Sequence, residues 1–195
     1  MTLIIIEGVN GTGKSTYADK LSFEYGSTTL RAFRRDPNQH FDGESKIEMN
    51  LRRAGIPFNT HVEDFYIADT LATIDLGNDI RTVLDRSLPS ALAYGQWPKM
   101  PSATVPGRTF MFELWKTMLE PIQRCIYVWL EASAGECAER IHDRPPSTRV
   151  FPAYETLVET YDWAYRSWSG RKLRIDTEKD SVEQGVELIL KTLNA

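Results

Sequence analysis

The chain reads Leu3-Ile4-Ile5-Ile6-Glu7-Gly8-Val9-Asn10-Gly11-Thr12-Gly13-Lys14-Ser15-Thr16 near its start. An apolar run leads into a loop that fits G-x-x-x-x-G-K-[ST], and a helix-like segment follows, which is the context this motif requires. Its glycines let successive backbone N–H groups turn inward around a polyphosphate, and the helix N-terminus adds a positive dipole end. We expect Lys14 to reach the β- and γ-phosphates and the Ser15 hydroxyl to bind Mg²⁺. The residues expected to hold this ligand are Gly8, Asn10, Gly11, Thr12, Gly13, Lys14, Ser15 and Thr16.

The size and charge of the chain exclude several classes of protein. Its 195 residues predict one domain, 1–195, and a net charge of −4 with a pI near 5.5 gives no basic coat for nucleic acid or anionic membranes. No apolar stretch is long enough for a membrane span, and the first apolar run is too short for a signal peptide. Cys125 and Cys137 have no metal-binding spacing, so we expect reduced thiols and a cytoplasmic protein.

Five strand-like runs recur along the chain, with helical patterns between them. This alternation predicts an α/β domain with a mainly parallel five-stranded sheet and helices on both of its faces. Ligands of such a sheet bind beyond the C-terminal ends of the strands, where Gly8 and Asp85 both lie. The runs are Thr2–Glu7, Thr28–Phe33, Arg81–Asp85, Cys125–Leu130 and Leu173–Asp176.

The helices carry start and stop signals. The first is expected over Lys14–Tyr25, with Gly26 ending it. Three capping boxes, each a Ser or Thr followed three residues later by Glu or Gln, open further helices. The segments 34–59 and 97–112 are polar and contain proline, so we expect loops over the C-terminal rim of the sheet. The capping boxes are Thr60–Glu63, Ser133–Glu136 and Ser181–Gln184.

A second motif, Asp85-Arg86-Ser87-Leu88-Pro89-Ser90, begins where the third strand ends. The Asp85 carboxylate would face the phosphate site, where it can hold the Mg²⁺ shell or steer an acceptor oxygen. Arg86 can neutralise phosphate oxygens with two parallel hydrogen bonds. The alternative is a strand-end Asp that caps the next helix, but the accompanying glycine-rich motif favours a functional role.

Two arginine-rich segments could add to the site. Arg140, Arg144 and Arg149 lie in a segment, roughly 138–152, that could close as a lid over a transferring phosphoryl group. Arg140 and Arg144 are our candidates for catalysis, and a solvated charged loop is the alternative. Phe33-Arg34-Arg35, after the second strand, could bind an acceptor's phosphate or be surface charge.

Several of these motifs resemble those of thymidylate kinases. The run from Glu7 to Thr16 looks like their E-G-x-D-G-x-G-K-S-T, and Asp85–Tyr94 looks like their D-R-Y-x-x-S-x-x-A-Y-Q. Phe65–Thr70 looks like their F-x-A-x-D-R helix, Phe33-Arg34-Arg35 is a loose match to their F-P-x-R, and the arginine-rich segment occupies the place of their lid. The resemblance implies a three-layer P-loop kinase fold. It also implies phosphoryl transfer from ATP–Mg²⁺ to a deoxynucleoside monophosphate, such as dTMP or a modified dUMP.

The resemblance also assigns roles to single residues. Lys14 would hold the donor phosphates, Ser15 and Asp85 the metal. Phe65 would stack on the acceptor base, and Tyr94 would crowd the ribose 2′ position to favour deoxyribose. The side chains expected around the acceptor are Glu7, Phe33, Arg34, Arg35, Phe65, Thr70, Arg86 and Tyr94.

The departures from the family pattern lie on the acceptor side. Asn10 replaces an Asp, Thr70 replaces the Arg that reads a pyrimidine carbonyl, and Ser87 replaces a Tyr. The motifs on the donor side are intact. We therefore expect ATP to be the donor, and the acceptor to be dTMP or another or modified pyrimidine nucleotide.

Other functions remain as alternatives. Deoxynucleoside kinases share the glycine-rich motif and an E-R-S motif, and their C-terminal pattern is echoed by Ala153–Tyr161. The acceptor would then be a nucleoside hydroxyl that needs a general base such as Glu7 or Asp85. A kinase of a modified base within DNA is a variant that the acidic charge disfavours.

A P-loop regulatory switch is the alternative from another class. The chain has no guanine-reading N-K-x-D, and the arginine-rich segment favours transfer over switching. We expect a small-molecule nucleotide acceptor as partner, without membrane or nucleic acid, and the sequence leaves homodimer formation open.

Overall fold

A computed structural model describes residues 2–31, 81–94, 106–119, 122–142 and 154–194, apart from the side chains at 30, 31, 91, 94 and 106–111. Within these residues strands and helices alternate, as the sequence predicts. The strands are β1 (Thr2–Glu7), β2 (Thr28–Arg31), β3 (Arg81–Asp85), β4 (Arg124–Glu131) and β5 (Arg171–Asp176). The helices are α1 (Lys14–Tyr25), α4 (Leu88–Tyr94), α5 (Pro106–Leu119), α6 (Ala134–Arg140), α7 (Tyr154–Ser167) and α8 (Val182–Asn194).

The described strands form one five-stranded, all-parallel sheet in the order β2-β3-β1-β4-β5. Ile4 of β1 is paired with Val83 on one side and Ile126 on the other. The chain reaches β3 on one side of β1 and then crosses to β4 on its other side. In open parallel sheets, ligands bind beyond the strand ends at such a switch of direction. The sheet therefore places a binding site at the C-terminal end of β1.

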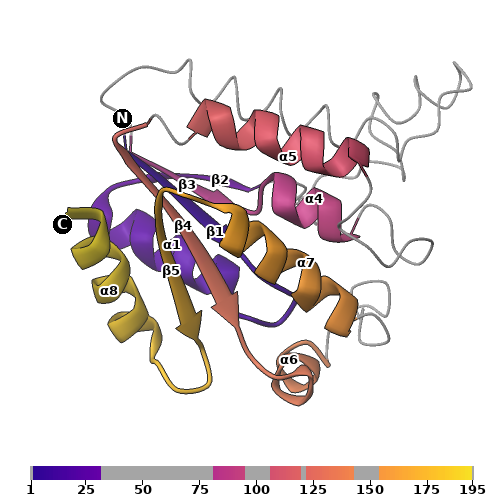
Figure 1. Cartoon of the computed structure of the whole chain (residues 1–195). Helices are drawn as coiled ribbons and strands as arrows, with labels where there is room; N and C mark the ends of the chain where they lie inside the picture. The colour runs from indigo at the N-terminus through magenta and orange to yellow at the C-terminus, as the bar shows by residue number, and fades with distance from the viewer. Residues whose placement is uncertain (1, 32–80, 95–105, 120–121, 143–153, 195) are drawn as a thin grey trace, which may run out of the picture.

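Helices cover both faces of the sheet (Figure 1), so the three-layer α/β fold predicted from the sequence is confirmed. Because side chains alternate along a strand, Leu3 and Ile5 of β1 pack under α4, α5 and α7, whereas Ile4 and Ile6 pack under α1 and α8. All four side chains are at most 1% exposed. This burial on both faces explains why β1 reads as a continuous apolar run.

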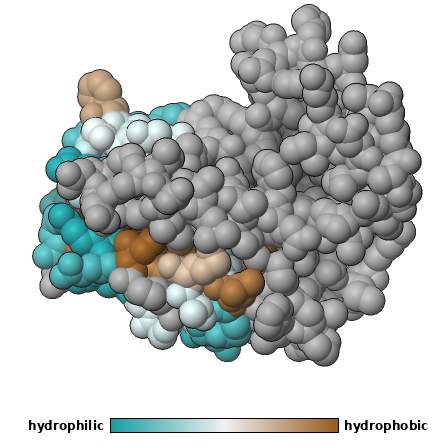
Figure 2. Space-filling model, turned by 90° about the horizontal axis from the view of Figure 1, so that it is seen from above, coloured by the Kyte–Doolittle hydropathy of each residue, from teal (hydrophilic) through white to brown (hydrophobic). Residues whose placement is uncertain are grey.

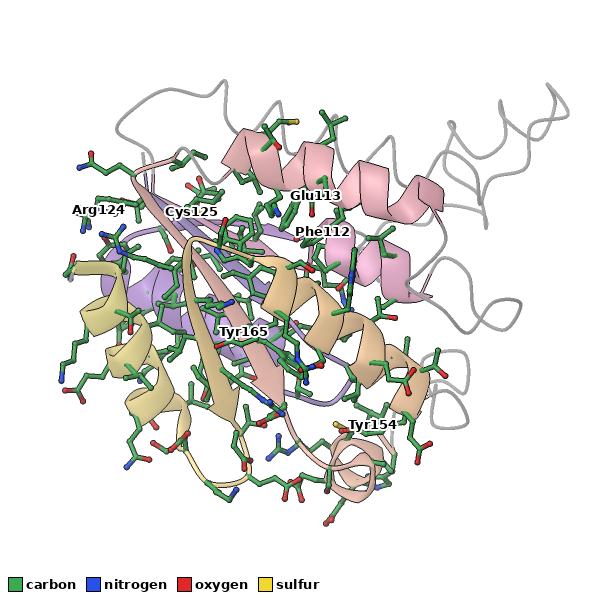
Figure 3. All side chains as sticks on the ribbon, in the orientation of Figure 1. Phe112, Glu113, Arg124, Cys125, Tyr154 and Tyr165 are labelled. Carbon is green, nitrogen blue, oxygen red and sulfur yellow. The ribbon has the colours of Figure 1, made fainter. Side chains whose placement is uncertain are left out.

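The face under α4, α5 and α7 is rich in aromatic side chains. Phe112 of α5 and Tyr165 of α7 both lie in this part of the molecule (Figure 3), and the Phe112 and Trp115 rings are 5.5 Å apart between centroids. Tyr127 of β4 stacks on Trp168 with centroids 5.7 Å apart. The aromatic rings of Tyr161 and Trp168 serve packing, since both residues are at most 1% exposed.

The structure confirms the predicted helix ends at three places, although one capping box forms only in part. Helix α1 ends at Gly26, whose φ of 62° is left-handed. At Ser181 both halves of the capping box form, with N···O distances of 2.9 and 3.3 Å between Ser181 and Gln184. At Ser133 only one half forms: Ser133 Oγ accepts from the Glu136 N–H at 3.3 Å. The expected return bond is absent, because the Ser133 N–H donates to the carboxylate of Glu178. The box at 60–63 lies outside the described residues.

The expectation of a loop over 97–112 is wrong from residue 106 onward, where α5 begins. Proline at the first position of a helix costs nothing, because the N–H it lacks has no partner there. Phe112, Trp115 and Leu119 follow at spacings of three and four residues and are fully buried on one helix face. The segment 34–59 lies outside the described residues.

The surface of the described residues carries few large apolar side chains. Phe23, Leu114 and Leu188 are 88%, 41% and 40% exposed. Figure 2, a view from the side of α5, shows a short row of apolar atoms bordered by hydrophilic atoms and by residues drawn in grey. Cys125 and Cys137 are both free thiols, and both are buried. None of the helices in the described ranges has the length and apolar character needed to cross a bilayer.

Candidate active site

The glycine-rich loop leaves β1 at its C-terminal end and enters α1 directly, as the motif predicts. Gly8, Gly11 and Gly13 have φ values of 148°, 93° and 86°, which side-chain-bearing residues rarely adopt. Space is also short at two of them. A Cβ on Gly11 would lie 2.6 Å from the carbonyl oxygen of Cys137 in α6, and one on Gly8 would lie 2.3 Å from that of Leu130 in β4. At Gly8 and Gly11 the loop is thus packed against neighbouring backbone that leaves no room for a side chain.

Lys14, the first residue of α1, folds back into the loop. Its ammonium donates to the Val9 carbonyl at 2.6 Å, and the Thr12 hydroxyl donates to the same oxygen at 2.9 Å. Only 5% of Lys14 is exposed. Burial, and then the nearby Arg86 cation, lower the pKa of the ammonium well below its usual range. The carboxylates of Asp85 and Glu7 offset only part of this effect, so an anion in the loop would stabilise the buried cation further.

Ser15 and Asp85 meet next to Lys14. The Ser15 hydroxyl at the start of α1 donates to Asp85 Oδ2, at the end of β3, over 2.8 Å. Hydroxyl and carboxylate oxygens are hard ligands that fit Mg²⁺, which binds through one or two protein oxygens when phosphates complete its shell. Among the described residues, no group of three or more His, Cys, Asp or Glu side chains could hold a metal ion by itself. The donor set therefore suits a metal shared with a phosphorylated ligand.

Arg86 ties the second motif to the glycine-rich loop. Its backbone has a φ of 79°, which makes it the one non-glycine residue with a left-handed backbone in the described part of the chain. Its N–H donates to the Ile6 carbonyl at 3.1 Å. The guanidinium crosses the site: Nη2 donates to the Asn10 side-chain oxygen, and Nη1 to Ser90 Oγ at 3.1 Å. Asn10, where the resembling family has Asp, thus still presents an oxygen to this arginine.

Glu7 lies beneath this arrangement. Its carboxylate is fully buried, and Oε1 accepts from the Ser87 N–H and from the Ser87 hydroxyl, both at 2.6 Å. Oε2 accepts from the Ser90 hydroxyl at 2.5 Å. Burial raises its pKa to about 7, although these hydrogen bonds and Arg86 favour the charged form. Both oxygens of Glu7, a residue that the sequence assigns to the acceptor, are thus engaged in hydrogen bonds to Ser87 and Ser90.

Three residues of this polar cluster are missing from the predicted site. Ser87 and Ser90 carry a weak signal, since both precede or open α4 next to Asp85 and Arg86. Tyr161 of α7 carries none, because Leu157 and Ala164, which share its helix face, are apolar and buried. Its hydroxyl nevertheless lies 2.9 Å from Ser90 Oγ and 3.5 Å from Arg86 Nη1.

Arg140, at the end of α6, contacts the rim of the site. Its guanidinium donates to the hydroxyl and the carbonyl of Thr177, both at 2.9 Å, and more weakly to the Gly11 carbonyl at 3.4 Å. Its Nε donates to Glu136 at 2.7 Å. Arg140 therefore touches the glycine-rich loop through that loop's backbone.

The remaining predicted residues are not placed by the structure. They lie outside the described residues, except that Tyr94 ends α4 with its side chain not described. Their proposed roles at the acceptor and in the lid stay predictions. These residues are Phe33, Arg34, Arg35, Phe65, Thr70, Arg144 and Arg149.

Comparison with known proteins relates the fold to kinases. No protein-family model matches the chain, and no curated protein matches its sequence. Among solved structures, YorR protein from Bacillus subtilis in complex with phosphorylated GDP matches with a TM-score of 0.65 and 19% identity, covering 99% of this chain and 96% of YorR. Deoxyadenosine kinase from M. mycoides with bound dATP matches with a TM-score of 0.64 and 19% identity, covering 100% of both chains. The same kinase with bound dCTP gives 0.63 and 18%, covering 99% of both. The chain has this α/β P-loop kinase fold.

Proposed function

We propose that the protein transfers a phosphoryl group from ATP to a deoxynucleoside or a deoxynucleoside monophosphate. One observation carries the proposal: the C-terminal ends of β1 and β3 bring Lys14, Ser15, Asp85 and Arg86 together around one loop. Backbone amides, an ammonium, two oxygen ligands and a guanidinium are what phosphoryl transfer needs, since this reaction depends on positioning and charge neutralisation.

Each side chain then has a defined task. The loop amides and Lys14 bind the β- and γ-phosphates, for which the ammonium exchanges its contact with the Val9 carbonyl. Ser15 and Asp85 hold Mg²⁺, which neutralises phosphate charge when it is bound. Arg86, which already reaches across the loop to Asn10, lies beside the reacting phosphates and stabilises their charge.

Two acceptor classes follow from different observations. The motifs shared with thymidylate kinases favour a pyrimidine deoxynucleoside monophosphate, for which Tyr94 would exclude a ribose 2′-hydroxyl. The full-length fold similarity to deoxyadenosine kinase favours a deoxynucleoside instead. For that acceptor, Asp85 is our candidate for the general base, because it is 5% exposed whereas Glu7 is fully buried.

A panel of acceptors tests the proposal. ADP formation from ATP and Mg²⁺ is measured with deoxyadenosine, deoxycytidine, thymidine, dTMP, dUMP, 5-hydroxymethyl-dUMP, dCMP and UMP, and each product is identified by mass. We expect one acceptor class to accelerate ATP turnover strongly, and deoxyribose to be preferred over ribose. ATP turnover that no acceptor stimulates would replace the kinase by a regulatory P-loop module.

A further inference from the structure

Glu7 is the only acidic side chain among the described residues with no exposed surface at all. It is the last residue of β1, immediately before the glycine-rich loop. Its two oxygens accept three hydrogen bonds, and all three come from the turn and first helical turn that follow Asp85. A carboxylate used in this way holds a segment of chain 80 residues away in the sequence.

In each hydrogen bond around Ser90, the donor and the acceptor can be assigned. A guanidinium has no acceptor, so Arg86 Nη1 donates to Ser90 Oγ. Ser90 has a single hydroxyl hydrogen, which it donates to Glu7 Oε2. The hydroxyl of Tyr161, 2.9 Å from Ser90 Oγ, must then be the donor in that pair. Arg86 is thus linked to the negative charge of Glu7 through one hydroxyl.

The bonds to Ser87 act on the backbone of Arg86. Glu7 Oε1 accepts from both the N–H and the hydroxyl of Ser87, the residue directly after Arg86. The left-handed backbone of Arg86 aims its side chain back across the loop, toward Asn10. Holding Ser87 at two points therefore fixes the turn from which the Arg86 side chain projects.

The charges around Glu7 match this arrangement. Arg86 is the cation that favours its ionised form, and Glu7 in turn favours the charged form of Lys14. The hydroxyl of Tyr161 reaches this cluster through Ser90, and that of Tyr127 is buried with no hydrogen-bond partner among the described residues. The carboxylate of Glu7 therefore interacts electrostatically with two cations of the site.

We propose that Glu7 is a positioning residue that holds the Arg86 guanidinium across the glycine-rich loop, through Ser87 and Ser90. It does not touch the acceptor. As far as the rate is concerned, this inference rests on the proposed phosphoryl transfer, in which Arg86 neutralises the reacting phosphates.

The experiment compares Glu7→Gln and Ser90→Ala with the unaltered protein. Glu7→Gln keeps the shape and one carbonyl oxygen but removes the charge, and Ser90→Ala removes the hydroxyl that links Glu7 to Arg86. Glu24→Gln, at an exposed position of α1, is the matched control. The guanidinium resonances of Arg86 are recorded by NMR, with Arg86→Lys to assign them, and kcat and the KM for ATP are measured on the best acceptor.

We expect a slowly rotating Arg86 guanidinium in the unaltered protein and in Glu24→Gln, and a freely rotating one in Glu7→Gln and Ser90→Ala. Both variants should lose kcat by about tenfold or more, as for one hydrogen bond to a charged group, while the KM for ATP stays within about twofold. Together these results would support positioning.

Other outcomes overturn the proposal. If Arg86 stays immobile in both variants, Glu7 does not hold it, whatever happens to the rate. If Glu7→Gln abolishes transfer while Ser90→Ala leaves kcat unchanged, Glu7 acts as a general base instead. If the unaltered protein transfers phosphate to no acceptor, the proposed function fails, whereas the guanidinium spectra still decide whether Glu7 holds Arg86.

Discussion

The two halves of the candidate site are held in different ways. The half that Lys14 and Ser15 belong to is built from backbone: glycine conformations and close backbone contacts shape the loop. The half that Asp85 and Arg86 belong to is held by side chains, through Glu7, Ser90 and Tyr161. The first half is therefore fixed by a short local motif, and the second by groups scattered over the chain.

The hydrophobic cores on the two faces of the sheet, which support the two halves of the candidate site, also differ. Under α1 and α8 the core is mostly aliphatic, with Ile4, Ile6 and Val186 in one cluster. Under α4, α5 and α7 it is aromatic, and the hydroxyl of one core ring, Tyr161, reaches the site. An aliphatic layer can only support a loop, whereas an aromatic layer with hydroxyls can also orient its charges.

The largest effect is expected from removing the ammonium of Lys14, in the half of the site that is built from backbone. Lys14→Ala should lower kcat by about 10²–10³-fold or more, since a preorganised charge on the transferring group is lost, and leave the fold intact. The measurement is steady-state ADP formation, with circular dichroism as a check on folding. Lys20→Ala, on the same helix but half-exposed, should keep the normal rate. Near-normal turnover in a folded Lys14→Ala protein would contradict the kinase proposal.

The side-chain-built half should show itself in the pH dependence of stability. The pKa of Glu7 is about 7 in the folded protein against an ordinary 4.5, so the folded state keeps a proton that the unfolded chain releases. This contribution is fully present below pH 4.5 and is lost as the pH rises through about 7. The free energy of unfolding, relative to that of Glu7→Gln, should fall by about 3 kcal/mol across this range.

Urea titrations at several pH values measure this difference for Glu7→Gln and for the exposed control Glu24→Gln. The control should differ from the unaltered protein by nearly the same amount at every pH. A Glu7→Gln difference that is equally flat would show that Glu7 does not titrate with a raised pKa.

Substitutions at two glycines distinguish the effect of steric crowding from that of a left-handed backbone conformation. Gly11→Ala should lower the free energy of unfolding by about 2–3 kcal/mol, because it combines a left-handed φ with a clash against the Cys137 backbone. Gly26→Ala has a left-handed φ of 62° but nothing within 4 Å, so about 1 kcal/mol is expected. Denaturant titration of both variants gives the two values. Equal losses would mean that α6 yields and does not confine the loop.

The smallest effect is expected from one hydroxyl. Tyr161→Phe keeps the ring in the aromatic core but removes the donor to Ser90, which should cost about 1 kcal/mol of stability and lower kcat about fivefold. Tyr165→Phe, one helical turn away on α7, serves as the control. Equal losses of kcat in the two variants would show that the Tyr161 hydroxyl has no specific role at the site.

The sequence predicts the fold and the backbone-built half well, because both depend on local patterns. The β1 run and the glycine-rich motif predict that Lys14 and Ser15 begin α1, and the strand pattern predicts that Asp85 ends β3, as the structure shows. For Glu7 an acid beside a glycine-rich loop suggests a ligand contact, whereas the structure shows its carboxylate buried among three hydrogen bonds. Its burial depends on Ser87, Ser90 and Tyr161, which only the folded chain brings to it.

The helix α5 shows the same limit at the level of secondary structure. Proline and polar residues before Phe112 predict a loop, but the first turn of a helix accepts them when a buried face follows. Likewise, Arg140 approaches Gly11 because β5 and α6 end side by side, so that Thr177 receives its guanidinium. No spacing in the sequence carries that information.

The left-handed backbone of Arg86 places two selective pressures in opposition at a single residue. Glycine would suit this conformation and avoid a cost of about 1–2 kcal/mol, but it would discard the guanidinium that the proposed phosphoryl transfer uses. Evolution toward robustness and evolution toward turnover therefore pull position 86 in different directions. Stabilising substitutions are best sought elsewhere, for example in α8 or on the surface of α1, where stability and turnover do not compete for the same residue.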